Sequence, residues 1–125
     1  MRRPGVDEYG EAGVKSESNA SGQWVRVAGT QEVGSQQGHV VQIGKRRLAL
    51  FEVNGKIVCI DDRCPHAGGR LGEGQVCGSV VHCPRHGWRF DLVDGRCLSD
   101  PRFEVQRYSV KIDDGVVFVE LPGQE

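Results

Sequence analysis

Residues 64–69 read CPHAGG, and residues 83–88 read CPRHGW. Each short stretch places one Cys near one His, as Cys-x-His in the first and as Cys-x-x-His in the second. Thiolate and imidazole are the side chains that soft and borderline metals prefer in proteins. The two stretches therefore predict a pair of metal-binding loops with four candidate ligands, which are Cys64, His66, Cys83 and His86.

The spacing of these ligands bears on the kind of metal site. Zinc fingers usually take two Cys from one knuckle and two His from another, whereas here each loop supplies one of each. A binuclear site, in which each loop spans two metals, explains this arrangement. A Cys₂His₂ zinc module without a redox role remains the alternative from a different class.

The segments around the loops are short, rich in Val, Ile, Leu and aromatic residues, and separated by Gly, Asp or Asn, which is typical of β-strands. Asn54-Gly55, Asp94-Gly95 and Asp114-Gly115 predict three hairpin turns, because these residues tolerate the positive φ of tight turns. The sequence therefore predicts an all-β fold, an antiparallel sandwich or partly open barrel, with both loops at one end. The expected strands lie within residues 23–28, 39–44, 47–53, 56–60, 79–82, 89–93, 105–112 and 116–121.

Length and composition predict one small module. The 125 residues suffice for one core, and residues 1–21 contain almost no bulky apolar side chain, so we expect a flexible tail followed by one domain over residues 22–125. The 16 basic and 17 acidic residues are mixed along the chain and give a formal net charge of -1, which argues against nucleic acid as a partner. No segment is apolar enough to cross a membrane or to serve as an export signal. We expect a soluble, cytoplasmic protein.

Five cysteines without an export signal favour metal binding over a disulfide framework. Cys59 and Cys97 fall in strand-like segments and are expected to be small buried hydrophobes, while Cys77 is expected to be a free surface thiol. His82 should point away from the site by strand alternation, and His39 should be solvated.

The two loops and their surroundings resemble the Rieske family, whose 2Fe-2S centre replaces two Cys with two His on one iron. The resemblance extends over GEGQVCGSVVHCPRHGWRFDLVDGRCL (72–98) and KIDDGVVFVEL (111–121), and it covers about residues 23–122. It implies a Rieske-type 2Fe-2S cluster as the cofactor. Cys64 and Cys83 would hold the inner iron, and His66 and His86 would hold the outer iron near solvent.

Four positions indicate which kind of Rieske protein the chain resembles. Gly69 and Arg85 stand where respiratory members carry an extra disulfide, and Trp88 and Phe90 stand where those members carry a Ser and a Tyr hydroxyl that donate to sulfur. Without these donors we predict a low-potential centre. Trp88 is expected to pack over the cluster and Arg85 to face outward. The SDPRF segment around Pro101 forms either a third, shielding loop or a plain turn.

The resemblance implies a one-electron carrier with no substrate-converting site of its own. Rieske oxygenases add a catalytic 2-His-1-carboxylate iron site, for which only His39 and His82 remain. The expected partners are a flavin-dependent NAD(P)H reductase as donor and a terminal oxygenase as acceptor. The small subunit of an assimilatory nitrite reductase is the alternative within electron transfer.

Overall fold

The computed structural model describes residues 22–66 and 68–122. They fall into two compact units: the described part of the first is residues 22–25 and 120–122, and the second is Arg26–Val119. Both candidate ligand loops lie in the second unit. The tail predicted for residues 1–21 lies outside the described residues, and a single domain over residues 22–125 stays a prediction.

The described residues form ten strands and two short 3₁₀-helices. No helix among them reaches the length and apolarity that a membrane crossing requires. In chain order the elements are β1 (Gly22–Gly29), η1 (Thr30–Glu32), β2 (His39–Ile43), β3 (Arg46–Val53), β4 (Lys56–Asp61), η2 (Leu71–Glu73), β5 (Gln75–Cys77), β6 (Val80–His82), β7 (Arg89–Asp91), β8 (Arg107–Tyr108), β9 (Val110–Asp113) and β10 (Val116–Pro122).

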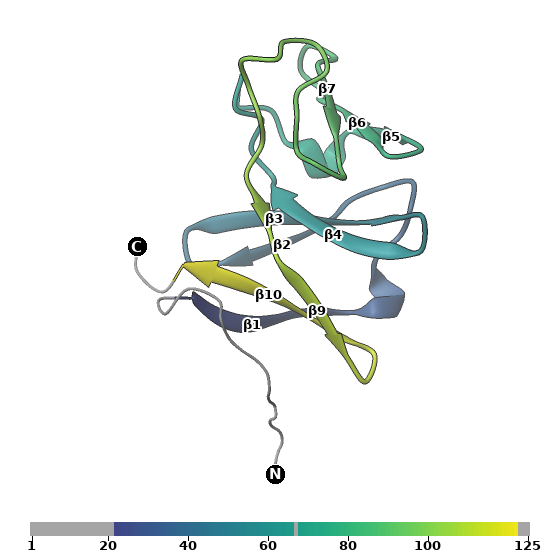
Figure 1. Ribbon diagram of the computed structural model, residues 1–125, viewed down its shortest axis with the longest axis vertical. Coiled ribbons are helices and arrows are strands. Elements are labelled where there is room, and N and C mark those ends of the chain that lie inside the picture. Colours follow the sequence, from purple (N-terminus) through teal and green to yellow (C-terminus); the bar gives the residue numbers. More distant parts are fainter. Residues whose placement is uncertain (1–21, 67, 123–125) are drawn as a thin grey trace. The chain divides into compact units, whose positions relative to one another are not determined.

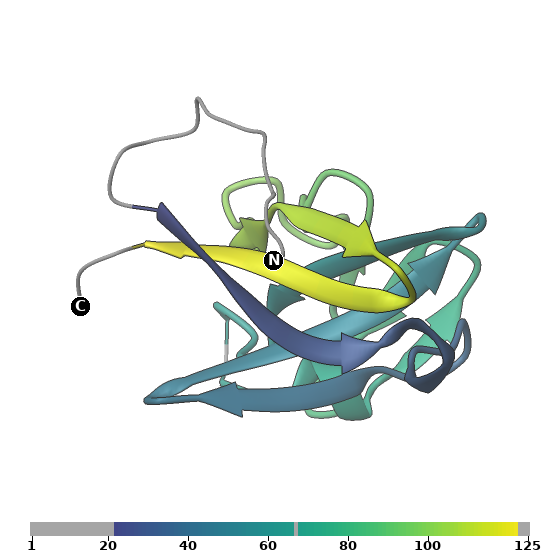
Figure 2. The same cartoon turned by 90° about the horizontal axis from the view of Figure 1, so that it is seen from below.

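The strands make three sheets, with the orders β1-β10-β9, β2-β3-β4-β8 and β5-β6-β7. The pairings with a defined register are all antiparallel. In the second sheet β2, β3 and β4 run side by side, which can be followed in Figures 1 and 2. The first candidate ligand loop follows β4, and the second joins β6 to β7. The all-β prediction, with both loops inserted between strands, is therefore confirmed.

One hydrophobic core joins the β2-β3-β4-β8 sheet to the small β5-β6-β7 sheet. The middle of β3 supplies fully buried side chains, and Val81 and Phe90 of the small sheet pack in the same core. Two of its other members are the candidate ligands Cys64 and Cys83. Both loops therefore start from fixed, buried positions rather than from the surface.

Asp62, the only described charged residue that is fully buried, fastens the first loop to the sheet. Its Oδ1 accepts a hydrogen bond from the Gly72 amide at 2.7 Å, and its Oδ2 accepts one from Arg47 Nε at 3.3 Å. Its carbonyl accepts from the Leu71 amide at 2.6 Å. These bonds tie η2 to the end of β4 and close the intervening chain into a loop.

The structure departs from the predicted strand pattern at residues 105–112. This segment was expected to be one strand, but it forms β8, which pairs with β4, and β9, which pairs with β10. Ser109 separates them, so the chain passes from one sheet to another at that residue. Hydrophobic alternation is the same on both sides of such a crossing, and the sequence therefore gives no signal for it.

The chain turns at all three predicted sites, and at two of them the turn is a two-residue hairpin. Asn54 and Asp114 adopt φ of 53° and are followed by glycines with positive φ, as a two-residue hairpin requires. At Asp94-Gly95 the turn is longer, because β7 already ends at Asp91 and only an isolated bridge joins Phe90 to Cys97. The chain still reverses there, with Gly95 at a φ of 83° and Phe90 antiparallel to Cys97, so the predicted turn forms with a longer loop.

Gly74→Ala is expected to destabilise the fold by about 3 kcal/mol, because a Cβ at this position overlaps the carbonyl oxygen of His82. That oxygen belongs to the backbone of β6 and cannot move aside cheaply. Gly34→Ala is the matched control, since nothing lies within 4 Å of its Cβ, and its effect should stay within about 0.5 kcal/mol. Denaturant midpoints measure both variants. Equal denaturation midpoints for the two variants would show that the backbone of β6 can shift without a loss of stability.

Candidate metal centre

The two candidate ligand loops share one backbone design. In the first, the Cys64 amide donates to the Gly69 carbonyl and the Gly68 amide donates to the Cys64 carbonyl, both at 2.8 Å. The second loop repeats both bonds around Cys83, at 2.7 and 2.8 Å. The fifth residue of each loop is a glycine with positive φ, 75° at Gly68 and 74° at Gly87, which other residues rarely adopt. Each loop is thus a closed turn that starts at its cysteine.

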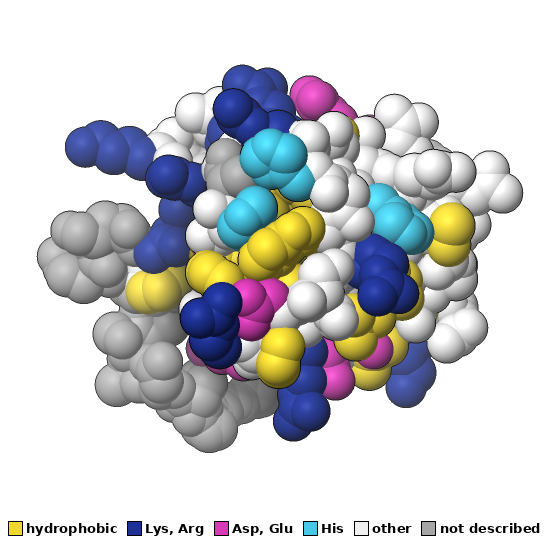
Figure 3. All heavy atoms as spheres, turned by 90° about the horizontal axis from the view of Figure 1, so that it is seen from above, with side chains coloured by type: hydrophobic (Ala, Val, Ile, Leu, Met, Phe, Trp, Pro, Cys, Tyr) yellow, Lys and Arg dark blue, Asp and Glu magenta, His cyan; other side chains and the backbone are white. Residues whose placement is uncertain are grey.

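The loops differ in where the imidazole is attached. Counting from each cysteine, His66 is the third residue of its loop and His86 the fourth, so Arg85 occupies the position that matches His66. Despite this offset, the two imidazole rings come together, with centroids 5.5 Å apart and an interplanar angle of 68°. Figure 3 shows two neighbouring imidazoles beside a hydrophobic patch on the face seen from above.

Burial separates the two kinds of donor. Cys64 and Cys83 are 1% and 2% exposed, whereas both imidazoles are exposed. The thiols therefore lie on the core side and the imidazoles on the solvent side. The assignment of the thiols to an inner iron and of the imidazoles to an outer iron stays a prediction.

An aromatic stack supports the imidazole of the first loop. The His66 ring lies flat on Trp88, with centroids 3.6 Å apart and planes 9° from parallel. Phe103 meets Trp88 edge-on at 5.4 Å and His66 at 6.2 Å. The predicted packing role of Trp88 agrees with these contacts. Phe103 belongs to the SDPRF segment, so this segment does lie against the site as a third loop.

The residues present fit a binuclear cluster with mixed ligands. A Cβ on Gly69 would approach Cys83 Sγ to 2.6 Å, so the glycine leaves room beside the buried thiol. In residues 22–66 and 68–122 no three His, Cys, Asp or Glu side chains gather as ligands of a single ion. A mononuclear zinc site takes four donors at one point, whereas a 2Fe-2S cluster takes two protein donors at each iron.

The positions that separate the Rieske classes lie where the resemblance puts them. A Cβ on Gly69 would be 3.2 Å from Arg85 Cβ, so the two positions at which respiratory members carry the disulfide are neighbours here. Trp88 is half-buried and Phe90 fully buried. Neither side chain can donate a hydroxyl hydrogen bond to a sulfur atom.

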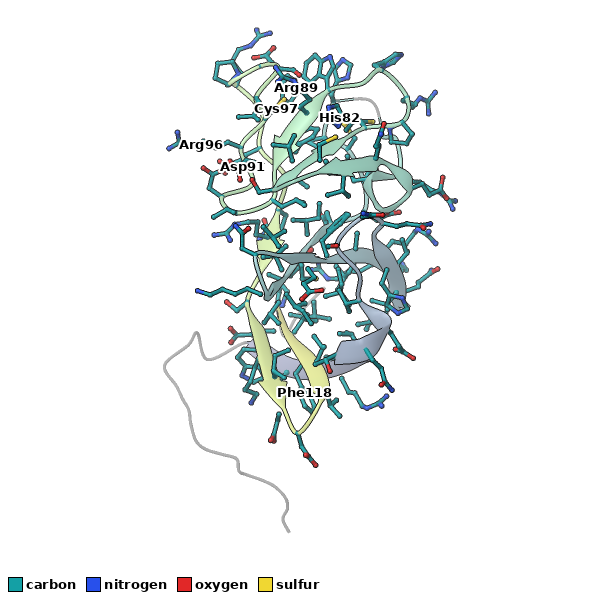
Figure 4. All side chains as sticks on the ribbon, turned by 90° about the vertical axis from the view of Figure 1, so that its right-hand side faces the viewer. His82, Arg89, Asp91, Arg96, Cys97 and Phe118 are labelled. Carbon is teal, nitrogen blue, oxygen red and sulfur yellow. The ribbon has the colours of Figure 1, made fainter. Side chains whose placement is uncertain are left out.

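Most of the remaining Cys and His residues lie where they were expected. Cys59 and Cys97 are buried and Cys77 is exposed. His82 lies opposite Arg89 in the β6-β7 ladder, with its Nδ1 3.3 Å from the Gln75 carbonyl oxygen (Figure 4).

The prediction for His39 needs correction. His39 was expected to be solvated, but it begins β2 opposite Leu50 and is half-buried. Its Nε2 lies 3.9 Å from Glu32 Oε1 of η1. The strand expected at residues 39–44 does form, and its pairing with β3 accounts for the partial burial of His39.

Two features of the site were missed from the sequence. Asp62, which anchors the first loop, looked like one of many acidic residues. In the third loop Asp100 and Arg102 form an ion pair with oxygen and nitrogen 2.7 Å apart, and hydrogen bonds from Arg102 lower the pKa of Asp100 to about 2. The Asp-Pro-Arg spacing was a usable signal for this pair, because a short turn brings residues two apart together.

Cys59 is expected to resist alkylation in the folded protein, while Cys77 reacts. Burial raises the pKa of Cys59 from 9.0 to about 12, so its thiolate fraction at pH 8 falls about 10³-fold. Iodoacetamide treatment followed by peptide mass spectrometry measures both sites, and Cys77→Ser is the control that removes the fast reaction. Modification of Cys59 as fast as that of Cys77 would contradict the burial of the Cys59 side chain.

Comparison with known proteins assigns this geometry to a family. The model of the Rieske [2Fe-2S] domain matches residues 23–109. A naphthalene 1,2-dioxygenase system ferredoxin component from Pseudomonas aeruginosa is 32% identical over 99 residues, which are 78% of this chain and 95% of the relative. The solved Sphingomonas yanoikuyae B1 ferredoxin aligns with a TM-score of 0.75 at 28% identity, over 80% of this chain and 100% of that chain.

A putative NADH-dependent nitrite reductase small subunit from Mycobacterium tuberculosis has a similar fold. It aligns with a TM-score of 0.72 at 24% identity, over 80% of this chain and 96% of that chain. The likeness at this identity concerns the fold. The predicted resemblance, fold class and cofactor type are confirmed by the family match and by the ferredoxin relatives.

Proposed function

The chain belongs to the Rieske [2Fe-2S] domain family, and from this premise we propose that it is a soluble carrier of single electrons to a terminal oxygenase. The relative from Pseudomonas aeruginosa is the ferredoxin component of a dioxygenase system, and this chain spans 95% of its length. The observation that carries the proposal is the paired arrangement of two buried thiols beneath two exposed imidazoles.

Cys64, His66, Cys83 and His86 are the proposed ligands of the cluster. The matching backbone of the two loops, the burial order of the donors and the space beside Gly69 support this assignment. When bound, a Rieske cluster supplies reversible one-electron chemistry. Cys64 and Cys83 would hold the inner iron against the core, and His66 and His86 would hold the outer iron where a partner can approach.

The other residues of the site would orient and shield these ligands. Trp88 fixes the plane of the His66 ring by stacking, and together with Phe103 it covers the ring from one side. Asp62 holds the base of the first loop through the Gly72 amide. Rigid ligands need little rearrangement when an electron arrives or leaves, which favours rapid transfer.

We propose a flavin-dependent NAD(P)H reductase as the electron donor and an oxygenase as the acceptor. Purified protein should contain two irons and two acid-labile sulfides per chain and show a rhombic electron paramagnetic resonance signal after reduction. NADH with such a reductase should reduce it, and the reduced protein should support oxygenase turnover. One zinc per chain without visible absorbance would instead establish the zinc module.

Substitution of a histidine ligand tests the assignment of the site. His66→Cys and His86→Cys should keep a cluster at a lower potential, since thiolate donates more negative charge than neutral imidazole. His82→Cys is the matched control from the adjacent strand. An unchanged spectrum and potential in either ligand variant would remove that imidazole from the proposed set.

The midpoint potential is expected near the lower end of the roughly -150 to +300 mV range of Rieske centres. Trp88 and Phe90 provide no hydroxyl donor to sulfur, and donors of that kind raise the potential by stabilising the reduced state. Redox titration followed by visible circular dichroism measures it. A midpoint above about +100 mV would contradict the argument from the missing hydroxyls.

A further inference from the structure

Two arginines face each other at the base of the first ligand loop. Arg63 and Arg70 form an isolated antiparallel bridge, and both side chains are exposed. Residues directly opposite each other in such a bridge project to the same face with Cβ atoms about 5 Å apart. Like charges directly opposite each other destabilise the folded state. The presence of two arginines here is therefore not explained by a contribution to stability.

A third arginine reaches the same loop from the second ligand loop. The side chain of Arg85 packs on Gly69, since a Cβ there would lie 3.2 Å from its Cβ and 3.4 Å from its Cδ. The Nε of Arg63 would lie 3.7 Å from a Cβ on the adjacent Gly68. Arg63 and Arg85 thus flank two consecutive glycines of the first loop, next to His66. We call Arg63, Arg70 and Arg85 the arginine rim.

The charge of the arginine rim is largely uncompensated. Arg70 has one acidic neighbour, Glu73, at 3.8 Å and at the surface. Within the described part of the chain, no ion pair joins Arg63 or Arg85 to a carboxylate. The carboxylates of Asp62 and Asp100 are each paired with a different arginine, Asp62 with Arg47 and Asp100 with Arg102. Basic side chains border the two neighbouring imidazoles in Figure 3.

We propose that the arginine rim is a docking surface for the electron acceptor. It would bind carboxylates on the surface of that acceptor that are grouped around the acceptor's own redox centre. This inference rests on the proposed function, because it makes the exposed imidazoles the point of electron exit. Guanidinium groups bind carboxylates in a bidentate geometry that fixes orientation as well as proximity. Exposed charges of this kind speed association and make it dependent on salt. The formal net charge of the whole chain is -1, so the arginine rim is a local feature and not part of an overall positive charge.

The charge reversal Arg63→Glu/Arg85→Glu tests the inference on the cluster-loaded protein. Small redox reagents report the local field: the reduced protein should be oxidised faster by the anion ferricyanide at low than at high ionic strength. In the double variant the rate at low ionic strength should fall on the order of tenfold, and the salt dependence should reverse. Lys45→Glu, in the exposed β2-β3 turn, is the matched control and should behave like the wild type.

Binding of a carboxylate polymer tests the partner chemistry directly. At low salt, the fluorescence anisotropy of fluorescein-labelled poly-L-glutamate should rise when the wild-type protein or Lys45→Glu is added. It should not rise when the double variant is added. If the charge reversal impairs folding, Arg63→Gln/Arg85→Gln replaces it, and it should weaken poly-L-glutamate binding in the same direction but to a smaller extent. The midpoint potential of each variant separates docking from a changed driving force.

The outcomes distinguish the two proposals. A protein that loads and reduces its cluster, yet shows salt-independent oxidation and no poly-L-glutamate binding, overturns the docking surface and leaves the electron carrier intact. Tighter binding of a single-stranded RNA homopolymer than of poly-L-glutamate would assign the arginine rim to nucleic acid and also overturn the inference. A protein that holds no reducible cluster overturns both.

Discussion

Cys83→Ser should abolish the cluster and lower the free energy of unfolding by about 3 kcal/mol or more. The Cys83 thiol is 2% exposed and belongs to the hydrophobic core. A serine hydroxyl in its place is a poor iron ligand and also a polar group buried in an apolar environment. The loss has two parts, because cluster binding is coupled to folding and the packing also changes.

Iron and sulfide analysis, visible circular dichroism and guanidinium unfolding measure these two parts. Comparison of the variant with wild-type protein stripped of iron isolates the contribution of packing alone. Cys77→Ser removes an exposed thiol and should leave iron content and stability unchanged. A Cys83→Ser protein with full iron content and the wild-type spectrum would show that this cysteine is not a ligand.

Asp62→Ala is expected to cost about 2–4 kcal/mol and to loosen the first ligand loop. The substitution leaves the Gly72 amide without its acceptor in a buried place and removes the ionic partner of Arg47. The side chain of Arg47 is 35% exposed and can turn to water, so the cost should lie below that of a fully buried pair.

Asp62→Asn removes the charge but keeps the shape of the side chain. Its amide oxygen can still accept one of the two hydrogen bonds, so its stability should lie between those of the wild type and Asp62→Ala. Asp113→Ala, at an exposed carboxylate of β9, is the control and should change stability by less than about 0.5 kcal/mol. Urea midpoints measure stability, and hydrogen exchange at Cys64 and Gly68 measures loop opening. Equal midpoints for Asp62→Ala and Asp113→Ala would mean that the buried carboxylate does not anchor the loop.

The parts of the fold that the sequence predicts are those determined by neighbouring residues. The turn at Asn54-Gly55 is specified by its own backbone preferences, and each ligand loop carries its Cys, His and Gly within six residues. Burial of Cys59 likewise follows from the apolar strand β4 that contains it.

The parts that escaped prediction depend on residues far apart in the chain. Asp62 is recognisable as an anchor only when Arg47 and Gly72 are seen beside it, and Phe103 joins the site only because the third loop folds back over Trp88. The break at Ser109 exists because β4 and β10 compete for the same segment. No local propensity encodes such tertiary choices.

The matching backbone of the two cysteine loops means that one template serves two tasks. Its third position carries an imidazole in the first loop and the guanidinium of Arg85 in the second. In the two proposals made above, the same loop position therefore supplies a cluster ligand in the first loop and a docking contact in the second. On those proposals we expect a substitution at residue 85 to change the choice of partner while both cysteines and both imidazoles keep their positions.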